Sequence, residues 1–303
     1  MKKLKIALDW TPNINHIGLF IALEKGFYSN LGLDVAILNP DTDGYKMTPG
    51  KKLDLDLADF AITPFETVIS LNNKANKIDA IAVYAILQED ISSIVTLQSS
   101  GIDRPNLLAG KTYASYKARY EDLIVQEMIK NDGGITAANL IYPEKLGIWN
   151  TLQEGKADAT WIFNNWEGVE AKNKNIELHS FTMRDYKIPY CYSPIMITKQ
   201  QSIIDKRAYY QNFVKATRAG YLFCHENADE ALSILAKYVS RQDQYNINLQ
   251  DALVATVPYI GSSETAGIMN EDRVRVFLDW LVAHKLEDAI ITSQKLFTNE
   301  LLT

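Results

Sequence analysis

The sequence predicts an α/β protein built from two lobes. Short apolar runs alternate with helix-like segments through the first 87 residues, and the same alternation returns between residues 111 and 161. Such alternation favours mostly parallel sheets with helices on their faces. At 303 residues the chain is also long for a single core, because typical domains hold roughly 100 to 200 residues. Two similar α/β units in tandem therefore predict two lobes that face each other across a cleft.

The first unit consists of an apolar run at residues 4–8, a polar turn and a helix-like run at residues 16–25. In a parallel sheet such a turn lies at the carboxyl edge, where ligands bind. We therefore expect the turn to form one wall of a small-molecule site. Its candidate binding residues are Asp9, Trp10, Asn13 and His16. The alternative is that Trp10 is a core aromatic and that Asn13 bonds only its own backbone in the turn.

The rest of the first half continues the alternation. Strands are expected at residues 34–38, 57–62 and 78–87, with a polar loop at residues 39–50 and a helix at residues 65–74. The apolar runs are short and are bounded by turn-forming residues, which is typical of buried strands.

Two candidate binding residues, Thr63 and Glu66, follow the strand at residues 57–62. Pro64 lies between them, and a proline in the first turn of a helix leaves backbone N–H groups pointing outward. Glu66 can accept hydrogen bonds from an exocyclic amine or a ring N–H. The alternative is that the helix dipole alone favours an acidic residue at this position.

The second unit repeats the order of the first. It has expected strands at residues 111–114, 139–142 and 155–161 and expected helices at residues 120–130 and 148–154. Five candidate binding residues end this unit: Trp161, Asn164, Asn165, Trp166 and Glu167. A flat heteroaromatic ring needs an aromatic face and a few donors and acceptors around its edge. Strand alternation makes it difficult for both tryptophans to face the ligand, so one of them can instead be packing.

Two further loops carry candidate residues. Tyr116 and Lys117 lie in the turn before the helix at residues 120–130, and Lys117 and Arg119 bring two positive charges that can serve an anionic substituent. The alternative is a solvated turn. Tyr190 and Tyr192 lie in a proline-bounded segment that we expect near the mouth of the cleft, with a surface loop as the alternative.

Helices replace the alternating pattern after an expected strand at residues 195–198. They are expected at residues 205–225, 228–238, 249–255 and 273–284. Helices without intervening strands cannot build a third α/β lobe, so we expect them to pack on an existing sheet.

Composition excludes several classes of partner. The net charge is −6 and the pI is about 5.4, which argues against a nucleic-acid-binding surface. Two cysteines and four histidines show no metal-ligand spacing, so neither a structural metal nor a disulfide is expected. No apolar stretch reaches the roughly 18 residues of a membrane span. We expect a monomer.

The cellular location is left open by the first residues. Met1-Lys2-Lys3 runs straight into the first expected strand and leaves no room for a secretory signal. The protein is therefore expected to be periplasmic or at the cell surface if an export signal was trimmed, and cytoplasmic if Met1 is the native start.

The opening segment resembles the NMT1/THI5-like family, which joins ThiY-type substrate-binding proteins for thiamin pyrimidines to the fungal pyrimidine synthases. The matching residues are Asp9-Trp10-Thr11-Pro12-Asn13, Asn15, His16, Gly18, Lys25-Gly26-Phe27-Tyr28 and Gly32-Leu33-Asp34-Val35. The resemblance implies a two-lobed periplasmic-binding-protein type II fold with two interlobe crossovers, near residues 88–95 and 190–197. It places lobe I at residues 1–90 plus 196–303, with the C-terminal helices, and lobe II at residues 91–195.

The resemblance implies a solute-binding protein that captures a 4-amino-5-hydroxymethyl- or aminomethyl-2-methylpyrimidine in the cleft, with an ABC transporter permease as its partner. The alternative is a cytoplasmic enzyme of the thiamin pathway, such as a pyrimidine phosphate synthase that uses pyridoxal phosphate. The synthase lysine is replaced here by Thr63, and only Cys191 remains of the cysteine-rich segment. We therefore expect binding without turnover and no cofactor. Cys191 as a nucleophile is a weaker alternative, because no histidine lies near it in sequence.

Overall fold

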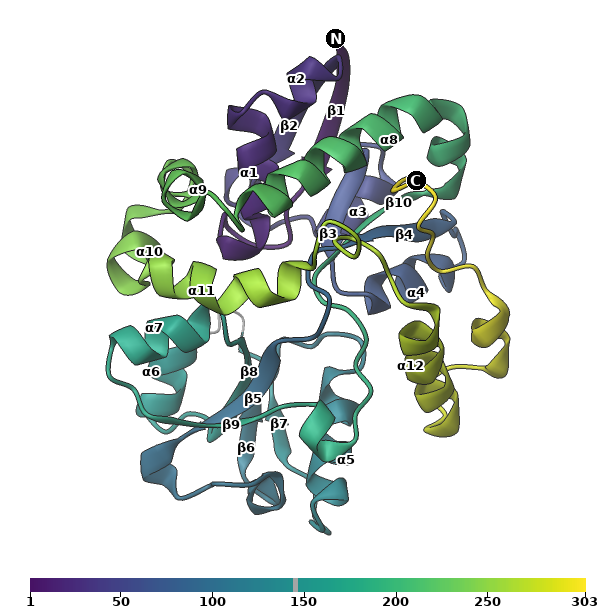
Figure 1. Cartoon of the computed structure of the whole chain (residues 1–303). Helices are drawn as coiled ribbons and strands as arrows, with labels where there is room; N and C mark the ends of the chain where they lie inside the picture. Colours follow the sequence, from purple (N-terminus) through teal and green to yellow (C-terminus); the bar gives the residue numbers. More distant parts are fainter. Residues whose placement is uncertain (144–146) are drawn as a thin grey trace.

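Two five-stranded sheets, one above the other in Figure 1, organise the computed structural model, which describes residues 1–143 and 147–303. We refer to the half around the first sheet as lobe I and to the half around the second as lobe II. Each sheet carries helices on its faces, as alternating strands and helices require.

The sheet of lobe I has the order β2-β1-β3-β10-β4. Its strands are β1 (Lys2–Ala7), β2 (Leu33–Leu38), β3 (Phe60–Thr63), β4 (Ala80–Ala85) and β10 (Ile195–Lys199). β1 pairs in parallel with β2 and β3, whereas β10 is antiparallel to both of its neighbours. Every residue of β3 and β4 is buried, because helices or the other lobe cover both faces of these two strands.

The sheet of lobe II has the order β7-β6-β8-β5-β9. Its strands are β5 (Ser92–Leu97), β6 (Thr112–Ala114), β7 (Asn139–Ile141), β8 (Ala159–Phe163) and β9 (Leu178–Phe181). β6 pairs in parallel with β7 and β8, whereas β5 is antiparallel to β8 and β9. The predicted mostly parallel sheets are therefore present, each with one reversed strand.

The reversed strand of each sheet is the first strand after the chain changes lobes. The chain crosses from β4 to β5 through residues 86–91 and returns from β9 to β10 through residues 182–194. The second connection begins earlier than expected, because β9 ends the strands of lobe II at Phe181. The division into residues 1–90 plus 196–303 and 91–195 remains our proposal for the lobe boundaries.

Lobe I carries six helices that lie against its sheet or its turns. They are α1 (Ile17–Glu24), α2 (Phe27–Asn30), α3 (Pro49–Asp54), α4 (Glu66–Asn72), α8 (Gln200–Phe223) and α9 (Ala228–Leu235). The described part of lobe II carries α5 (Glu121–Asn131), α6 (Ile148–Gln153) and α7 (Glu167–Asn173). Short 3₁₀ helices are η1 (Ile14–His16), η2 (Pro40–Asp43), η3 (Gln98–Ser100), η4 (Pro105–Leu108), η5 (Arg184–Tyr186) and η6 (Ala289–Ser293).

Helices α1 and α8 approach each other through two glycines. A Cβ atom on Gly220 would lie 2.0 Å from the carbonyl oxygen of Gly18, and one on Gly18 would lie 2.3 Å from the ring of Tyr221. This close packing lets the Tyr221 hydroxyl donate to the carbonyl of Asn15 at 2.7 Å. Helix α8 therefore holds the turn that follows β1, which the sequence predicts to be part of the site.

The last helices are α10 (Arg241–Asn246), α11 (Leu249–Ile260) and α12 (Glu271–Ala283). In Figure 1, α11 runs along the boundary between the lobes and α12 lies to the right, below α4. Asp251 pairs with Lys172 of α7 at 3.1 Å, and the ring of Phe277 contacts those of Tyr120 and Tyr190. The expectation that all C-terminal helices pack on lobe I is therefore too narrow, because α11 and α12 also contact lobe II.

The apolar core continues from one lobe into the other. One buried cluster contains Phe65 of lobe I, Ile124 of lobe II and Phe277 of α12, and a second includes Trp166 of lobe II among the residues of lobe I. The lobes are thus closed on each other, with apolar side chains buried between them.

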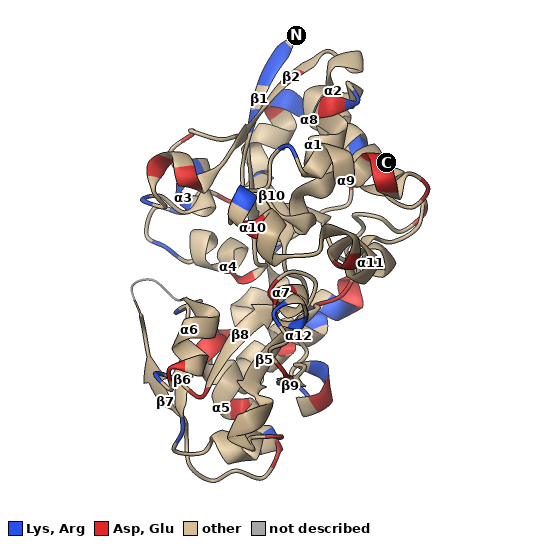
Figure 2. Ribbon diagram, turned by 90° about the vertical axis from the view of Figure 1, so that its left-hand side faces the viewer, with Lys and Arg blue, Asp and Glu red and all other residues tan. Residues whose placement is uncertain are grey.

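Charged residues of both signs are distributed over both lobes (Figure 2). No helix in the described residues is long and apolar enough to cross a membrane. The same residues contain no group of three or more histidine, cysteine, aspartate or glutamate side chains that could hold a metal ion. Both cysteines, Cys191 and Cys224, are buried thiols.

Candidate ligand-binding site

A cavity of about 200 Å³ lies between the lobes, where turns from both sheets meet. Nine residues predicted from the sequence line it: Asp9, Trp10, Asn13, Glu66, Tyr116, Trp161, Trp166, Glu167 and Tyr190. Eight further residues complete its wall: Asn15, Pro64, Ala118, Glu121, Ile124, Ile162, Phe163 and Ser193. Most of these side chains are aromatic, acidic or amide-bearing.

The turn after β1 is held rigid by its own hydrogen bonds. The Asn13 side chain accepts from the N–H of Asn15 at 2.9 Å, and Nδ1 of His16 accepts from the N–H of Asn13 at 3.3 Å. Nε2 of His16 is therefore the nitrogen that carries the hydrogen, and it lies 2.8 Å from Oδ1 of Asp9. His16 is fully buried and lies outside the cavity lining, so its role in the structure is to orient Asp9.

Trp10 lies at the edge of the cavity with 46% of its surface exposed. Its ring packs against that of Tyr45, with the centroids 5.4 Å apart and the planes tilted by 56°. A core aromatic would be buried on all sides, so the core-packing alternative does not fit Trp10. The exposed part of Trp10 therefore lies at the edge of the cavity, where a bound ligand can contact it.

Glu66 is the first residue of α4, and its side chain is buried in the cavity wall. The Tyr190 hydroxyl lies 3.0 Å from each of its carboxyl oxygens and can donate to either. Burial raises the pKa of Glu66 to about 7, although the hydrogen bond from Tyr190 acts in the opposite direction. At neutral pH this carboxyl group is therefore available in both protonation states.

Glu167 is the counterpart of Glu66 in lobe II. It is the first residue of α7, which follows β8 as α4 follows β3, and its Oε2 accepts from the N–H of Phe163 at 3.0 Å. Burial raises the pKa of Glu167 to about 7 as well. Two glutamates from equivalent positions of the two lobes thus line one cavity.

The two tryptophans after β8 occupy different environments. Trp161 is partly exposed and its ring contacts that of Tyr190, with the centroids 5.5 Å apart at an angle of 65°. Trp166 is 4% exposed and belongs to an apolar cluster shared with lobe I. The sequence-based alternative, that one tryptophan is packing, therefore describes Trp166, which contributes only part of its surface to the cavity wall.

Glu121 was not among the predicted site residues. Its carboxylate accepts from the Tyr113 hydroxyl at 2.8 Å and from the N–H groups of Tyr116 and Ala118 at 3.0 and 3.1 Å. Burial raises the pKa of Glu121, and the three hydrogen bonds oppose that rise. The sequence signal available for Glu121 was its place in the first turn of a helix that follows a strand and turn, the same place that singled out Glu66.

Six predicted residues lie outside the cavity lining: His16, Thr63, Lys117, Asn164, Asn165 and Tyr192. The amine of Lys117 lies over the ring of Tyr142, 5.3 Å from its centroid. The hydroxyl of Tyr192 points away and accepts from the N–H of Asn270 at 2.9 Å. The side chains of Lys117 and Tyr192 are thus engaged with other parts of the protein.

The two asparagines after β8 bind protein groups. Nδ2 of Asn164 donates to the hydroxyl of Ser93 at 2.8 Å. Nδ2 of Asn165 donates to Oδ1 of Asn15 at 2.7 Å and to the hydroxyl of Thr256 at 2.9 Å. Asn165 therefore joins the lobes directly, and it positions Asn15, which does line the cavity.

The charge of the cavity has one sign. Asp9, Glu66, Glu121 and Glu167 line it, and no lysine or arginine does so among the described lining residues. Carboxyl groups bind hydrogen-bond donors and cations, and they repel anions. The cavity therefore suits a neutral or cationic ligand that is rich in N–H groups and has an aromatic ring.

Pyridoxal phosphate, the cofactor that the synthase resemblance implies, does not fit this site. The cofactor binds covalently through a lysine amine, and Thr63 stands at the implied position. The Thr63 hydroxyl is buried without a hydrogen-bond partner, and the described cavity wall offers no amine.

Comparison with known families decides the affiliation of the chain. A family model described as "NMT1/THI5 like" matches residues 13–231. The chain belongs to the NMT1/THI5-like family. This match begins at Asn13 and includes Glu66, Glu121 and Glu167 of the cavity, so membership of the family is confirmed over most of the chain.

Members of this family differ in their named activities. The chain is 25% identical to a formylaminopyrimidine-binding protein of Halalkalibacterium halodurans over 82% of this chain and 73% of that relative. It is 28% identical to the 4-amino-5-hydroxymethyl-2-methylpyrimidine phosphate synthase THI13 of Saccharomyces cerevisiae, over only 52% of this chain and 45% of the synthase. A synthase of the same name from Legionella pneumophila is 22% identical over 92% of this chain and 83% of that relative, so the length of the match does not separate the two activities.

Solved structures confirm the predicted fold. The periplasmic nitrate-binding protein NrtA of Synechocystis PCC 6803 matches with a TM-score of 0.76 at 11% identity, covering 100% of this chain and 87% of that one. The periplasmic aliphatic sulphonate-binding protein SsuA of Escherichia coli matches with a TM-score of 0.71 at 13% identity, covering both chains completely. At such low identity these matches support the two-lobed periplasmic-binding-protein fold and nothing about the ligand.

Proposed function

We propose that this protein binds a 4-aminopyrimidine precursor of thiamin in the cavity between its lobes and delivers it unchanged to an ABC transporter permease. The observation that carries the proposal is that Glu66 and Glu167, one from each lobe, line the same aromatic-rich cavity, whose described lining contains no basic side chain. The similarity to a formylaminopyrimidine-binding protein supports this assignment.

The chemistry of the two glutamates matches the edge of an aminopyrimidine. A carboxylate accepts a hydrogen bond from the exocyclic amine, and a protonated carboxyl group donates one to a ring nitrogen. Because the pKa of each glutamate is raised to about 7, both forms are accessible near neutral pH. The ring itself would lie against the aromatic side chains, with Trp10 and Trp161 as our candidates for its faces.

The residues in and near the cavity favour delivery of the pyrimidine over its synthesis. The site does not fit pyridoxal phosphate, as described above. Cys191 is a poor nucleophile, since it is fully buried and its thiol pKa is raised well above the ordinary value by burial. A two-lobed fold that closes over a small molecule is well suited to capture and release.

Isothermal titration calorimetry tests the proposal. The full chain should bind 4-amino-5-hydroxymethyl-2-methylpyrimidine and its formylaminomethyl analogue, and mass spectrometry of the released ligand should show an unchanged mass. The analogue with hydrogen in place of the 4-amino group cannot donate to a carboxylate from that position, so it should bind at least about tenfold more weakly, a difference of about 1.4 kcal/mol. Absence of binding, equal binding of the analogue without the amino group, or formation of a product would contradict the proposal.

A further inference from the structure

The turn between β6 and α5 has the geometry of an anion-binding site. Lys117 adopts a left-handed conformation with a φ of 62°, and the N–H groups of Tyr116 and Ala118 on either side of it converge on one place. Successive N–H groups around a left-handed residue form a concavity that binds anions in many phosphate sites. The 11-residue helix α5 begins directly after this turn, and its N-terminus adds partial positive charge.

The protein fills this concavity with its own carboxylate. Oε1 of Glu121 accepts from the N–H of Tyr116 at 3.0 Å, and Oε2 accepts from the N–H of Ala118 at 3.1 Å. Oε1 also accepts from the buried hydroxyl of Tyr113 at 2.8 Å. Glu121 is 3% exposed and lines the ligand cavity, so its carboxylate lies where an anionic group of a ligand would meet the two N–H groups.

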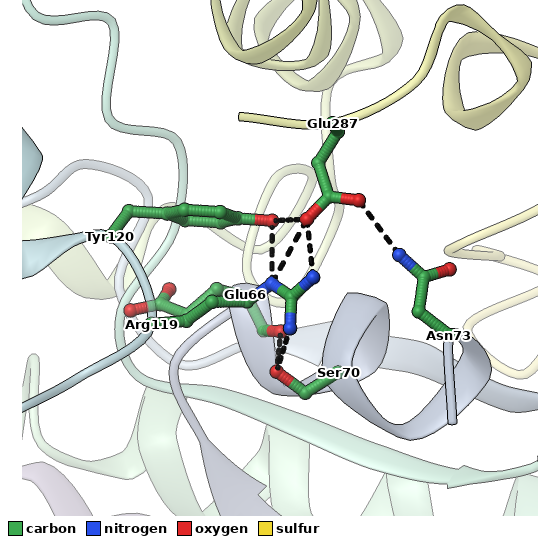
Figure 3. A network of polar contacts seen from close by, with 6 residues as sticks. All are labelled: Glu66, Ser70, Asn73, Arg119, Tyr120 and Glu287. Carbon is green, nitrogen blue, oxygen red and sulfur yellow. Dashed lines mark hydrogen bonds and ion pairs between the residues drawn. The ribbon is translucent and has the colours of Figure 1, made fainter. Parts of the chain in front are cut away.

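The positive side chains of the turn are directed elsewhere. Nε of Arg119 donates to Oε1 of Glu287 at 3.0 Å, and Figure 3 shows the guanidinium group held among Glu287, Tyr120 and Ser70. The Lys117 amine lies over the ring of Tyr142. The charged side chain that faces the cavity here is therefore Glu121, although the turn itself contains Lys117 and Arg119.

We propose that Glu121 is a specificity-determining residue that excludes phosphorylated pyrimidines by occupying the anion-binding turn with its carboxylate. The protein accordingly takes the unphosphorylated aminopyrimidine and rejects its phosphate monoester. A phosphate monoester carries a charge of about −1.5 to −2 at pH 7, and it would have to displace Glu121 and lie in a cavity with three other carboxyl groups. This inference rests on the proposed function and narrows it to one chemical class of ligand.

The test compares two ligands on three variants of the full chain. The ligands are 4-amino-5-hydroxymethyl-2-methylpyrimidine and its phosphate monoester, each titrated by calorimetry. Glu121→Ala empties the turn, and Glu121→Gln removes the charge while keeping the shape in case loss of the Tyr113 hydrogen bond prevents folding. Asp122→Ala is the matched control, because Asp122 lies in the same helical turn, accepts from the Ser115 hydroxyl at 2.7 Å and is outside the cavity lining.

The unsubstituted protein should prefer the free pyrimidine by at least about a hundredfold, which corresponds to about 2.7 kcal/mol. Glu121→Ala should reduce that preference at least about tenfold by gaining affinity for the monoester, Glu121→Gln should reduce it by a smaller factor, and Asp122→Ala should leave it unchanged. Equal binding of the two ligands by the unsubstituted protein would overturn the inference and leave the proposed function standing. The inference would also be overturned if the folded Glu121 variants kept the same preference for the free pyrimidine over its monoester.

Inorganic phosphate provides a readout that does not depend on the pyrimidine. If the unsubstituted protein binds neither pyrimidine, the proposed function fails, and the anion-binding turn is then tested by titrating phosphate into Glu121→Ala. Binding of phosphate to this variant and not to the unsubstituted protein supports the role of Glu121 as an internal anion. Absence of phosphate binding in that variant would overturn the inference together with the function on which it rests.

Discussion

Arg119 of lobe II donates a hydrogen bond to Glu287, which follows α12, and this contact lies near Glu66 of the cavity wall (Figure 3). The other carboxylate oxygen of Glu287 accepts from Nδ2 of Asn73 in lobe I at 2.7 Å. Ser70, which contacts Arg119, donates to the backbone carbonyl of Glu66 at 3.0 Å. We call Arg119, Glu287 and Asn73 the interlobe clasp, because one carboxylate joins both lobes next to the helix that begins with Glu66.

The interlobe clasp should favour the closed state. Glu287→Ala is expected to weaken ligand binding about fivefold, because Arg119 is 34% exposed and a screened pair contributes about 1 kcal/mol. Calorimetry measures the affinity, and small-angle scattering without ligand should show a larger radius of gyration. The matched control is Asp132→Ala, which removes an arginine–carboxylate pair within lobe II and should leave both quantities unchanged. Equal effects of the two variants on affinity would show that Glu287 does not act through closure.

Removing the Trp10 ring should affect binding more than folding. Trp10→Ala is expected to weaken pyrimidine binding by about 1 to 3 kcal/mol, the range for loss of an aromatic stacking partner of a base. The unfolding free energy without ligand should change little, because the ring is 46% exposed. Trp149→Ala is the contrasting control, since Trp149 lies in the core of lobe II and its loss should cost about 3 to 5 kcal/mol of stability. A large loss of stability with unchanged affinity in Trp10→Ala would show that Trp10 serves packing.

Stability without ligand should fall as the pH rises from about 4.5 to about 7. The folded protein holds protons on Glu66 and Glu167 more tightly than the unfolded chain, because burial raises the pKa of both groups from 4.5 to about 7. Their contribution is fully present below pH 4.5 and is lost as the pH passes 7. The glutamine introduced by Glu66→Gln cannot ionise. The free energy of unfolding of this variant, relative to that of the unsubstituted protein, should therefore be about 2 kcal/mol higher at pH 8 than at pH 5.

Urea unfolding at pH 5 and pH 8 measures this difference. Glu271→Gln, which changes an exposed glutamate in the first turn of α12, should leave the pH dependence unaltered. A Glu66→Gln variant that parallels the unsubstituted protein at both pH values would refute the raised pKa.

The contact between α1 and α8 should not tolerate a larger residue. Gly220→Ala places a Cβ 2.0 Å from the carbonyl oxygen of Gly18, so the helices must separate, and overpacking of this kind costs about 1 to 3 kcal/mol. Gly147→Ala is the control, because no atom of the described residues lies within 4 Å of its added Cβ and its φ is −87°. Chemical denaturation of both variants checks the prediction, which fails if they are equally stable.

Local sequence patterns predicted most of the fold. The turn after β1 and the Glu66 position could be recognised because strand, turn and helix follow one another within a few residues. Strand β5 was missed because it begins with Ser92 and Ser93, two polar residues that are buried because β5 lies between β8 and β9 in the second sheet. Its environment comes from strands that are distant in the sequence.

The site was predicted less completely because its contacts are mostly long-range. Asn165 was expected to bind the ligand, yet its partners Asn15 and Thr256 come from η1 and α11. Lys117 was expected to serve an anionic group, but the turn is occupied by Glu121. A sequence shows which polar groups are near a strand end, and it does not show which of them already have partners in the folded protein.

The reversed strand β10 imposes an order on the biosynthesis of the protein. It separates β3 from β4 in the first sheet, so within that sheet β4 has no neighbouring strand until residues 195–199 have been made. The strands of lobe II are all complete by Phe181. Once β9 has emerged from the ribosome, the nascent chain can therefore assemble the sheet of the second lobe, while the sheet of the first lobe still lacks the strand that joins β3 to β4.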